Sequence, residues 1–597
     1  MKTWKTNLEE TKQRYINWWN HKGIILSMWE HFQEGVKPHA DIAPPAPARD
    51  LSQKWFDPQW RAEYLDWYVA HSSLMADMLP VANTQLGPGS LAAILGGVFE
   101  GGEDTIWIHP DPNFNDEIVF NPEHPNWLLH KELLKACKAK ANGNYFVGMP
   151  DLMEGLDVLA ALKGTDMVLL DTVMQPEVLE QQMQQINDIY FKVFDELYDI
   201  IREGDEMAFC YFSSWAPGKM SKLQSDISTM ISQDDYRRFV QPFIREQCQK
   251  IDYTLYHLDG VGAMHHLPAL LEIEELNAIQ WTPGVGEPQG GSPKWYDLYK
   301  KILAGGKSVM ACWVTLEELK PLLDHIGADG VHLEMDFHNE REVEQAMRII
   351  EEYTGSSSSV SADVHTNQPV GEQDNAQESI RIREEKSQEE DRMKPLYDAI
   401  VAGKLEPAVE VTKDAIAAGV LPQDIINGYM ITAMGEVGQR FQDGKAFVPQ
   451  LLMAGRAMKG ALELLKPLLA GNASATIGKI VIGTVKGDLH DIGKNLVASM
   501  LEGCGFEVIN IGIDVTCDKF VEAVKENKAD ILCMSALLTT TMTYMQDVIR
   551  ALEEAGIRDQ VKVMIGGAPV SQGFADEIGA DGYSDNANTA VAVAKVL

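Results

Sequence analysis

Short apolar runs alternate with amphipathic stretches over the last part of the chain. The run 479–485 is typical of a buried strand, and Leu496 and Met500 after it fall at helical spacing. Further strand-like runs, each followed by a helix-like stretch, come at 507–511, 530–535 and 562–565. This alternation predicts a doubly wound parallel sheet, that is, a Rossmann-like domain over 473–597.

The first part of the chain carries a longer series of the same kind. Helical periodicity is strongest at 176–201 and 295–303. Strand-like runs occur at 23–28, 207–211, 254–258, 278–281, 307–313 and 330–334. We therefore expect residues 1–354 to form an α/β domain, a (β/α)8 barrel of the TIM type, in which active-site residues lie at the carboxyl ends of the strands.

Apolar periodicity stops between these two regions. From Gly355 the sequence continues with a run of serines and is then dominated by Ser, Asn, Gln, Glu and Asp up to about residue 391. Such a composition cannot bury enough surface to order itself, which predicts a flexible linker over 355–391. Helical spacing resumes over 392–472, where an all-helical stretch is expected.

Length and composition narrow the class of protein. The 597 residues are too many for one hydrophobic core, so several domains are expected. A formal net charge of -37 argues against nucleic acid as a partner, because phosphate binding needs clustered cations. The cysteines form no CxxC pair, so no disulfide framework is expected. Without a long apolar run or a signal-peptide core, the sequence predicts a soluble cytoplasmic protein with no membrane contact.

The C-terminal strands end in residues suited to holding a large ligand. Asp488 and His490 lie in a glycine-rich loop between a strand and a helix, at the carboxyl ends of the strands, where open parallel sheets bind ligands. The imidazole can reach a metal held outside the protein. Ser535 and Thr539 follow the third strand of this domain, and the glycine pair 566–567 follows the fourth, where it lets a bulky group come close.

The segments GDLHDIG (487–493), SALLTTT (535–541) and IGGAP (565–569) resemble the cobalamin-binding domain of methionine synthase and of corrinoid proteins. The resemblance runs over about 393–597 and makes the helical stretch 392–472 a four-helix cap over the corrin. It implies cobalamin as cofactor, His490 as cobalt ligand, and Asp488 as the group that fixes its tautomer. It also implies corrin contacts from Gly487, Asp491, Gly493, Ser535, Leu537, Thr539, Gly566, Gly567, Phe441 and Val448. Taken alone, Phe441 and Val448 are ordinary bundle core.

The N-terminal region resembles the uroporphyrinogen decarboxylase superfamily at 150–159, 280–284 and 330–334. One branch of that superfamily comprises zinc-dependent methyltransferases that work with corrinoid proteins. The arginine-rich signature of the true decarboxylases is absent near 26–32, and an acidic chain fits a polycarboxylate poorly. Fusion to a cobalamin-type domain therefore favours the methyltransferase branch.

In that branch a His-x-Cys-Gly motif and a later cysteine bind zinc. Here the matching stretch is 257–260, with Asp259 in place of the cysteine, and the later position falls near Glu334. His257, Asp259 and Glu334 are thus predicted to hold Zn²⁺ at the carboxyl ends of barrel strands. A hydrogen-bonded core pair of His257 and Asp259 remains the alternative. Cys312 is a substitute ligand or a buried structural cysteine.

Oxygen ligands leave zinc a stronger Lewis acid than thiolates do, which suits polarising an ether oxygen. The predicted function is a corrinoid-dependent methyltransferase that moves a methyl group between a small O-methyl compound and the cobalt, through Co(I) and methyl-Co(III). His265 or His266 can supply a proton to the leaving oxygen. Transfer to a thiol or folate acceptor, a carrier or sensor without barrel catalysis, and a mutase or lyase stay open as alternatives.

Other partners follow from this chemistry. A methyl acceptor, folate or thiol, is expected, reached either directly or through a second methyltransferase, together with a reductive activator for Co(II). Tryptophans crowd the first part of the chain, where they either wall an aromatic substrate pocket or form core: Trp18, Trp19, Trp29, Trp55, Trp60 and Trp67.

Overall fold

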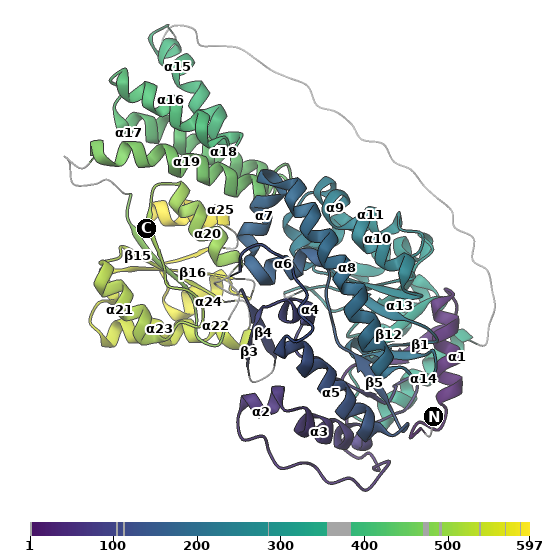
Figure 1. Cartoon of the computed structure of the whole chain (residues 1–597). Helices are drawn as coiled ribbons and strands as arrows, with labels where there is room; N and C mark the ends of the chain where they lie inside the picture. Colours follow the sequence, from purple (N-terminus) through teal and green to yellow (C-terminus); the bar gives the residue numbers. More distant parts are fainter. Residues whose placement is uncertain are drawn as a thin grey trace. The chain divides into compact units, whose positions relative to one another are not determined.

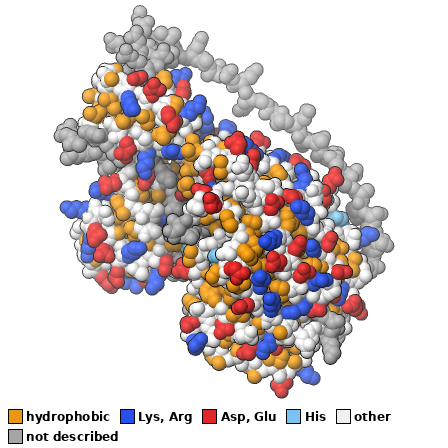
Figure 2. Space-filling view, in the orientation of Figure 1, with side chains coloured by type: hydrophobic (Ala, Val, Ile, Leu, Met, Phe, Trp, Pro, Cys, Tyr) orange, Lys and Arg blue, Asp and Glu red, His pale blue; other side chains and the backbone are white. Residues whose placement is uncertain are grey.

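The computed structural model divides into two compact units, residues 1–359 and 360–597 (Figure 1). It describes residues 3–102, 105–110, 114–284, 286–354, 384–469, 477–488, 492–536, 539–567, 569–584 and 587–597. Within these ranges no helix is long and apolar enough to cross a membrane. Acidic, basic and apolar side chains are interspersed on the face drawn in Figure 2, so the excess of acidic residues is not gathered there into one patch.

The C-terminal part of the second unit is an all-parallel sheet in the order β14-β13-β15-β16-β17. Its strands are β13 (Lys479–Thr484), β14 (Glu507–Asn510), β15 (Ile531–Ser535), β16 (Lys562–Gly566) and β17 (Gly582–Ser584). The connecting helices are α20 (Ile492–Gly503), α21 (Cys517–Asn527), α22 (Thr539–Met542), α23 (Tyr544–Glu554), α24 (Gln572–Ile578) and α25 (Ala587–Val596). The predicted Rossmann-like sheet is confirmed, and its strand order places the topological switch point between β13 and β15.

Strand β13 shows why this sheet is buried on both faces. Ile480 and Ile482 enter one hydrophobic core, whereas Val481 between them enters the core on the other face. Alternate side chains of a strand point to opposite faces, so a parallel sheet covered by helices on both sides needs a continuous apolar run. The sequence KIVIGT supplies that run.

The helical part of the second unit precedes this sheet. It comprises α15 (Glu384–Val401), α16 (Leu405–Ala417), α17 (Pro422–Ile425), a π-helical turn at Ile426–Met430, α18 (Ile431–Gln442) and α19 (Val448–Leu469). The buried faces of these helices share one core that includes Leu396, Ile400 and Met458. Residues 355–383, most of the predicted linker, lie outside the described residues, and α15 already begins at Glu384 within the stretch predicted as linker.

The first unit contains two main sheets. One is a six-stranded parallel sheet in the order β1 (Ile24–Ser27), β12 (Val331–Glu334), β11 (Ser308–Ala311), β10 (Ala278–Thr282), β9 (Tyr253–Asp259) and β8 (Met220–Leu223). The other runs β2 (Val81–Ala82), β5 (Phe146–Met149), β6 (Met207–Phe209) and β7 (Trp215–Ala216), the last strand antiparallel. First and last parallel strands pair, as in a (β/α) ring, but the described residues form no ladder between the two sheets. A closed barrel thus stays a prediction.

The helices of the first unit lie between the strands, singly or in series. The predicted helix 176–201 is α8 (Pro176–Ile201), and 295–303 lies on α12 (Tyr296–Ala304) with the turn before it. The others are α1 (Leu8–Trp19), α2 (Leu51–Phe56), α3 (Pro58–His71), α4 (Ser90–Ile94), α5 (Pro125–Ala141), α6 (Gly155–Lys163), α7 (Thr165–Met174), α9 (Gln233–Phe239), α10 (Gln241–Lys250), α11 (Leu267–Leu271), α13 (Leu316–Ile326) and α14 (Glu340–Thr354). A hairpin, β3 (Val98–Gly101) and β4 (Ile106–His109), completes the unit.

Candidate functional site

A histidine and two carboxylates gather where β8 and β9 end. His257 and Asp259 lie two residues apart at the end of β9, so their side chains share one face of the strand, and Asp226 follows β8. One ligand atom from each of these three residues lies within 4.8 Å of the other two. His257 Nε2 is 3.9 Å from Asp259 Oδ2. We call these three residues the metal-ligand group.

The neighbouring strand fixes the imidazole of this group. His257 pairs with Gln280 in the β9–β10 register, and its Nδ1 donates a hydrogen bond to Gln280 Oε1. The Gln280 amide is oriented in turn, since its Nε2 donates to Thr282 Oγ1 at 2.7 Å and to Cys312 Sγ at 3.0 Å. The lone pair of His257 Nε2 is then directed toward the carboxylates. Burial, with the nearby Lys222 cation, lowers the pKa of His257 to about 3, so the ring is neutral and ready to bind a metal.

The two carboxylates of the group are held close together, with Asp226 exposed and Asp259 of intermediate exposure. The surrounding protein and the Asp259 charge raise the pKa of Asp226 to about 7, and desolvation also raises the pKa of Asp259. Two acids brought this near each other favour a cation between them. One imidazole and two carboxylates form an acceptable ligand set for zinc, so these residues fit that ion.

The segment 150–159, which carried the superfamily resemblance, supports the metal-ligand group from behind. The Asp157 carboxylate accepts hydrogen bonds from the backbone N–H groups of Asp226 at 2.8 Å and Ile227 at 3.0 Å. Lys222 Nζ lies 2.6 Å from Asp151 Oδ2 and also donates to Gln224, whose amide donates to Asp226 Oδ2 at 2.9 Å. Buried polar partners thus fix both the backbone and the side chain of Asp226.

Glu334, the third predicted zinc ligand, is not brought into this group. It ends β12, and β11 and β10 lie between β12 and the strand that carries His257. Its Oε2 is 3.6 Å from Cys312 Sγ, its buried Oε1 has no hydrogen-bond partner, and burial raises its pKa to about 8. The predicted pair of His257 and Asp259 therefore comes together, and Asp226, which the sequence analysis missed, stands beside it instead of Glu334.

The two adjacent histidines proposed as proton donors are held by backbone carbonyls. His265 Nε2 lies 3.1 Å from the Ile231 carbonyl oxygen, and His266 Nε2 lies 2.8 Å from that of Ser228. The buried His266 ring also stacks on Tyr236, with 4.2 Å between ring centroids. These contacts give both rings a structural role in the turn beyond β9.

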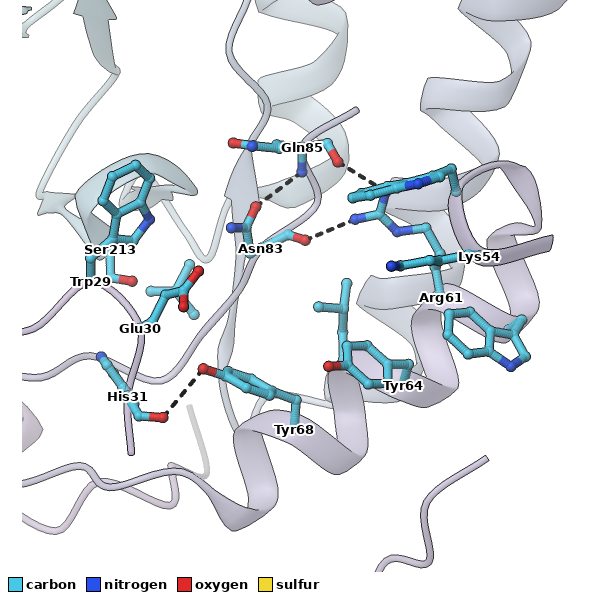
Figure 3. Close-up of a pocket in the computed structure, with 14 residues that line it drawn as sticks. Trp29, Glu30, His31, Lys54, Arg61, Tyr64, Tyr68, Asn83, Gln85 and Ser213 are labelled. Atoms are coloured by element: carbon cyan, nitrogen blue, oxygen red, sulfur yellow. Dashed lines mark hydrogen bonds between the residues drawn. The ribbon is translucent and has the colours of Figure 1, made fainter. Parts of the chain in front are cut away.

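A cavity of about 440 Å³ opens on the same unit (Figure 3). Aromatic side chains dominate its wall, and charged and amide groups complete it. We call it the tryptophan pocket; it is lined by Trp29, Glu30, His31, Lys54, Trp55, Trp60, Arg61, Tyr64, Leu65, Tyr68, Val81, Asn83, Gln85 and Ser213. Of the crowded tryptophans, Trp29, Trp55 and Trp60 therefore line a pocket, whereas Trp18 and Trp19 are core.

One strained turn joins the tryptophan pocket to the metal-ligand group. Phe212 and Ser213 both have left-handed backbone, with φ of 55° and 42°, which is rare outside glycine and marks functional sites. The Phe212 ring lies 5.2 Å from the Trp29 ring of the pocket and 6.0 Å from the His257 ring, centroid to centroid. A single aromatic ring thus separates the pocket wall from the metal-ligand group.

In the second unit, Asp488 spans the switch point of the sheet. It is buried in the loop after β13, and its Oδ2 accepts a hydrogen bond of 2.7 Å from Thr541 Oγ1, which lies beyond β15. Gly487, with φ of 81°, donates its N–H to Asp514 Oδ1 at 2.8 Å. Leu489, His490, Asp491 and Leu537 lie outside the described residues.

At the end of β16, Gly566 and the following Gly567 are positions where a side chain would meet neighbouring backbone. Gly567 has φ of 137°, and a Cβ on it would come within 1.8 Å of the Ala536 carbonyl oxygen. A Cβ on Gly566 would lie 3.0 Å from the Ser584 carbonyl oxygen. Neighbouring backbone segments thus pack closely here, which leaves a rim without side chains at Gly566 and Gly567.

The remaining predicted corrin contacts lie on three elements of the sheet domain and on two helices of the bundle. Ser535 ends β15, Thr539 begins α22, and Gly493 lies in the first turn of α20. Val448 is buried, and Phe441 packs against the bundle core. A polar cluster that the sequence analysis missed joins α20 to the end of β14: buried Lys494 donates to Asn495 Oδ1 at 2.6 Å and to Asn510 Oδ1 at 2.8 Å.

Comparison with known protein families finds matches in the second unit. Two family models, each described as a B12 binding domain, match residues 393–466 and 478–592. The chain is 48% identical over 192 residues to trimethylamine corrinoid protein 2 of Methanosarcina mazei, which covers 32% of this chain and 88% of that protein. It is 50% identical over 193 residues to dimethylamine corrinoid protein 1 of Methanosarcina acetivorans, with 31% and 91% covered.

Solved structures match the same share of the chain. A cobalamin-binding protein from Desulfitobacterium hafniense is 35% identical, with a TM-score of 0.31, and covers 34% of this chain and 97% of that one. The methanol:cobalamin methyltransferase complex MtaBC from Methanosarcina barkeri is 32% identical, with a TM-score of 0.32, and covers 37% and 85%.

The two family-model matches cover most of the helices α15 to α19 and the parallel sheet whose loops carry Asp488, Gly566 and Gly567. Both models describe B12 binding domains, so this part of the chain is matched to domains that bind a B12-type corrinoid. Through its second unit, the chain belongs to the family of corrinoid proteins related to those of methyltransferase systems.

Proposed function

We propose that this chain is a corrinoid-dependent methyltransferase that carries a methyl-donor site and its own corrinoid in one polypeptide. One combination supports it: a B12-binding module related to di- and trimethylamine corrinoid proteins is fused to a unit whose strand ends gather the metal-ligand group beside an aromatic pocket. The first unit would bind the methylated compound, and a corrinoid held by the second unit would supply the nucleophile for the methyl group.

In this proposal the donor is an O-methyl compound and the metal is Zn²⁺. Asp226, His257 and Asp259 would hold the ion, which supplies Lewis acidity to the departing oxygen. Gln280 keeps Nε2 of His257 free for the metal, and Asp157 holds the backbone at Asp226. Loss of a group that hydrogen-bonds a metal ligand typically lowers metal affinity or activity by roughly 10 to 100 fold.

The second unit presents the corrinoid. We propose His490 as the lower cobalt ligand and Asp488, fixed by Thr541, as the acceptor for the other ring nitrogen. The rim without side chains at Gly566 and Gly567 would face the cofactor tail. Further contacts are proposed for Gly487, Asp491, Gly493, Ser535, Leu537 and Thr539, with Phe441 and Val448 from the helical cap. A thiol or folate acceptor, a second methyltransferase and a reductive activator complete the cycle.

The test is a single-turnover reaction with the purified holoprotein. The corrinoid is reduced and mixed with a panel of methyl ethers, and its visible spectrum is followed. We expect conversion to the methylated corrinoid in the wild type and its loss in His257→Ala, with the corrinoid content of that variant unchanged. If His257→Ala reacts like the wild type, the metal-ligand group is not the donor site, and the chain acts as a carrier for another protein.

A further inference from the structure

We infer that the tryptophan pocket is a binding site for a small organic carboxylate with a flat apolar body. Its role as the substrate site rests on the proposed function, whereas the binding itself does not. The inference is carried by one buried guanidinium, the aromatic walls around it, and the place of the pocket beside the metal-ligand group.

Arg61 is a buried cation whose partners are neutral. It comes from α3, is 7% exposed, and donates from Nη1 to the Gln85 carbonyl oxygen at 2.9 Å and from Nη2 to that of Asn83 at 3.2 Å (Figure 3). No carboxylate in the described part of the chain forms an ion pair with it. A buried charge without a counter-ion is costly, and burial accordingly lowers the pKa of Arg61 to about 10. A ligand carboxylate would offset that cost, because a guanidinium matches it in geometry as well as charge.

The walls of the pocket are suited to a ring. Trp60 and Tyr64 stack at 5.4 Å between centroids with 6° between planes, and Tyr68 continues the row 6.2 Å from Tyr64. These flat surfaces offer offset or edge contacts to an aromatic ligand. The volume of about 440 Å³ lies in the range of ordinary small-molecule pockets.

Aromatic walls can also bind a quaternary ammonium. The charges around the tryptophan pocket argue against such a ligand. The Trp55 ring is already faced by two cations, with the Lys54 ammonium nitrogen and the Arg61 guanidinium carbon each 5.4 Å from its centroid. A further cation placed there meets like charge. The acidic member of the lining, Glu30, is exposed to solvent.

The geometry also orients the ligand. Figure 3 shows Arg61 and Trp29 on opposite sides of the pocket. Trp29 contacts Phe212, and Phe212 contacts His257. A carboxylate held at Arg61 therefore directs the body of the ligand toward the Trp29 wall, which only the Phe212 ring separates from His257 of the metal-ligand group.

The test measures binding of ligands that have no methyl group to transfer. Calorimetry on the full-length holoprotein compares benzoate with the neutral benzyl alcohol and with tetramethylammonium. We expect benzoate to bind roughly tenfold or more tighter than benzyl alcohol, because a hydrogen bond to a charged group is involved. Equal affinity for benzyl alcohol, or tighter binding of tetramethylammonium, would overturn the inference.

Variants sharpen this result. Arg61→Met should bring benzoate to the affinity of benzyl alcohol, whereas Arg238→Met, on exposed α9, should keep the preference. A preference that survives in folded Arg61→Met overturns the assignment. If that variant does not fold, the three-ligand comparison in the wild type decides alone.

Methyl transfer then separates this inference from the proposed function. Reduced holoprotein is offered meta-methoxybenzoate and anisole. Benzoate binding without methyl transfer from either ether supports the carboxylate site and contradicts the methyltransferase. Transfer from anisole as fast as from meta-methoxybenzoate, without benzoate binding, supports the methyltransferase and overturns the carboxylate site.

Discussion

The two units place their candidate sites at the same point of the α/β plan, the carboxyl ends of parallel strands, but they build them in opposite ways. In the second unit the rim is shaped by missing side chains, because Gly566 and Gly567 lie close to neighbouring backbone, and Asp488 is a buried carboxylate in another loop at the strand ends. In the first unit the rim is crowded with polar side chains that hold one another, such as Gln280 on His257 and Asp157 at Asp226. A large cofactor needs room, whereas a small metal site needs orientation.

The largest effect is expected at Gly567, where neighbouring backbone leaves no space for a side chain. Gly567→Ala would push a Cβ to within 1.8 Å of a carbonyl oxygen at a left-handed φ. We expect loss of corrinoid binding, together with roughly 1–3 kcal/mol of strain in the loop. Cobalt content after reconstitution is the measurement. Gly573→Ala in α24, where a Cβ meets its first neighbour at 3.9 Å, is the matched control and should bind normally.

The next prediction removes a ligand from the polar site. Asp226→Asn should release the metal and slow methyl transfer by roughly 100 fold or more, since a major source of leaving-group stabilisation is lost. Metal analysis and single-turnover rates are measured on the same preparation. Glu334→Gln, at the position predicted from sequence, should keep the metal, because Glu334 lies outside the group. Metal loss in Glu334→Gln with retention in Asp226→Asn would reverse the assignment.

A smaller effect is expected at Asp488, the proposed hydrogen-bond partner of the cobalt ligand. Asp488→Asn keeps the shape of the side chain but weakens its hold on a histidine proton, so corrinoid affinity or turnover should fall by roughly 10 to 100 fold. The visible spectrum of the bound corrinoid reports the change at the cobalt. Asp518→Asn, at an exposed position of α21, serves as control. An unchanged spectrum and turnover in Asp488→Asn would show that the carboxylate has no such role.

The smallest expected effect is on the stability of the first unit. Burial raises the pKa of Glu334 from 4.5 to about 8, so the folded chain keeps a proton that the unfolded chain releases near pH 4.5. Stability therefore falls as pH rises through this window, by at most about 1.4 kcal/mol per unit for one proton. Desolvation also raises the pKa values of Asp226 and Glu154 to about 7. The contribution of Glu334 should thus be clearest between pH 7 and 8.

Tryptophan fluorescence can follow this unfolding selectively, because all 13 tryptophans precede residue 314, in the first unit. Glu334→Gln should flatten the pH dependence of the denaturant midpoint between pH 7 and 8. A slope equal to that of the wild type would mean that Glu334 is already ionised in the folded chain.

The same difference between the two units explains how much of each site could be predicted from the sequence. The second unit has continuous apolar strands such as KIVIGT and glycines at fixed offsets, so its sheet and the position of Asp488 could be expected. In the first unit, β8 reads MSKL, and its polar Ser221 and Lys222 are buried. Without an apolar run this strand was not predicted, and Asp226 just beyond it was missed. Glu334 was grouped with His257 because strand ends share a rim, but sequence does not tell which strands are neighbours.

The most direct test of the central claim follows the methyl group itself. Full-length holoprotein with reduced corrinoid is given an isotope-labelled methyl ether, and the label is traced to the corrinoid in the wild type and in Asp226→Asn. The account predicts label on the corrinoid of the wild type, at most one methyl per cobalt, and almost none in the variant. Equal labelling of both proteins, or no labelling of the wild type by any methyl ether, would contradict it.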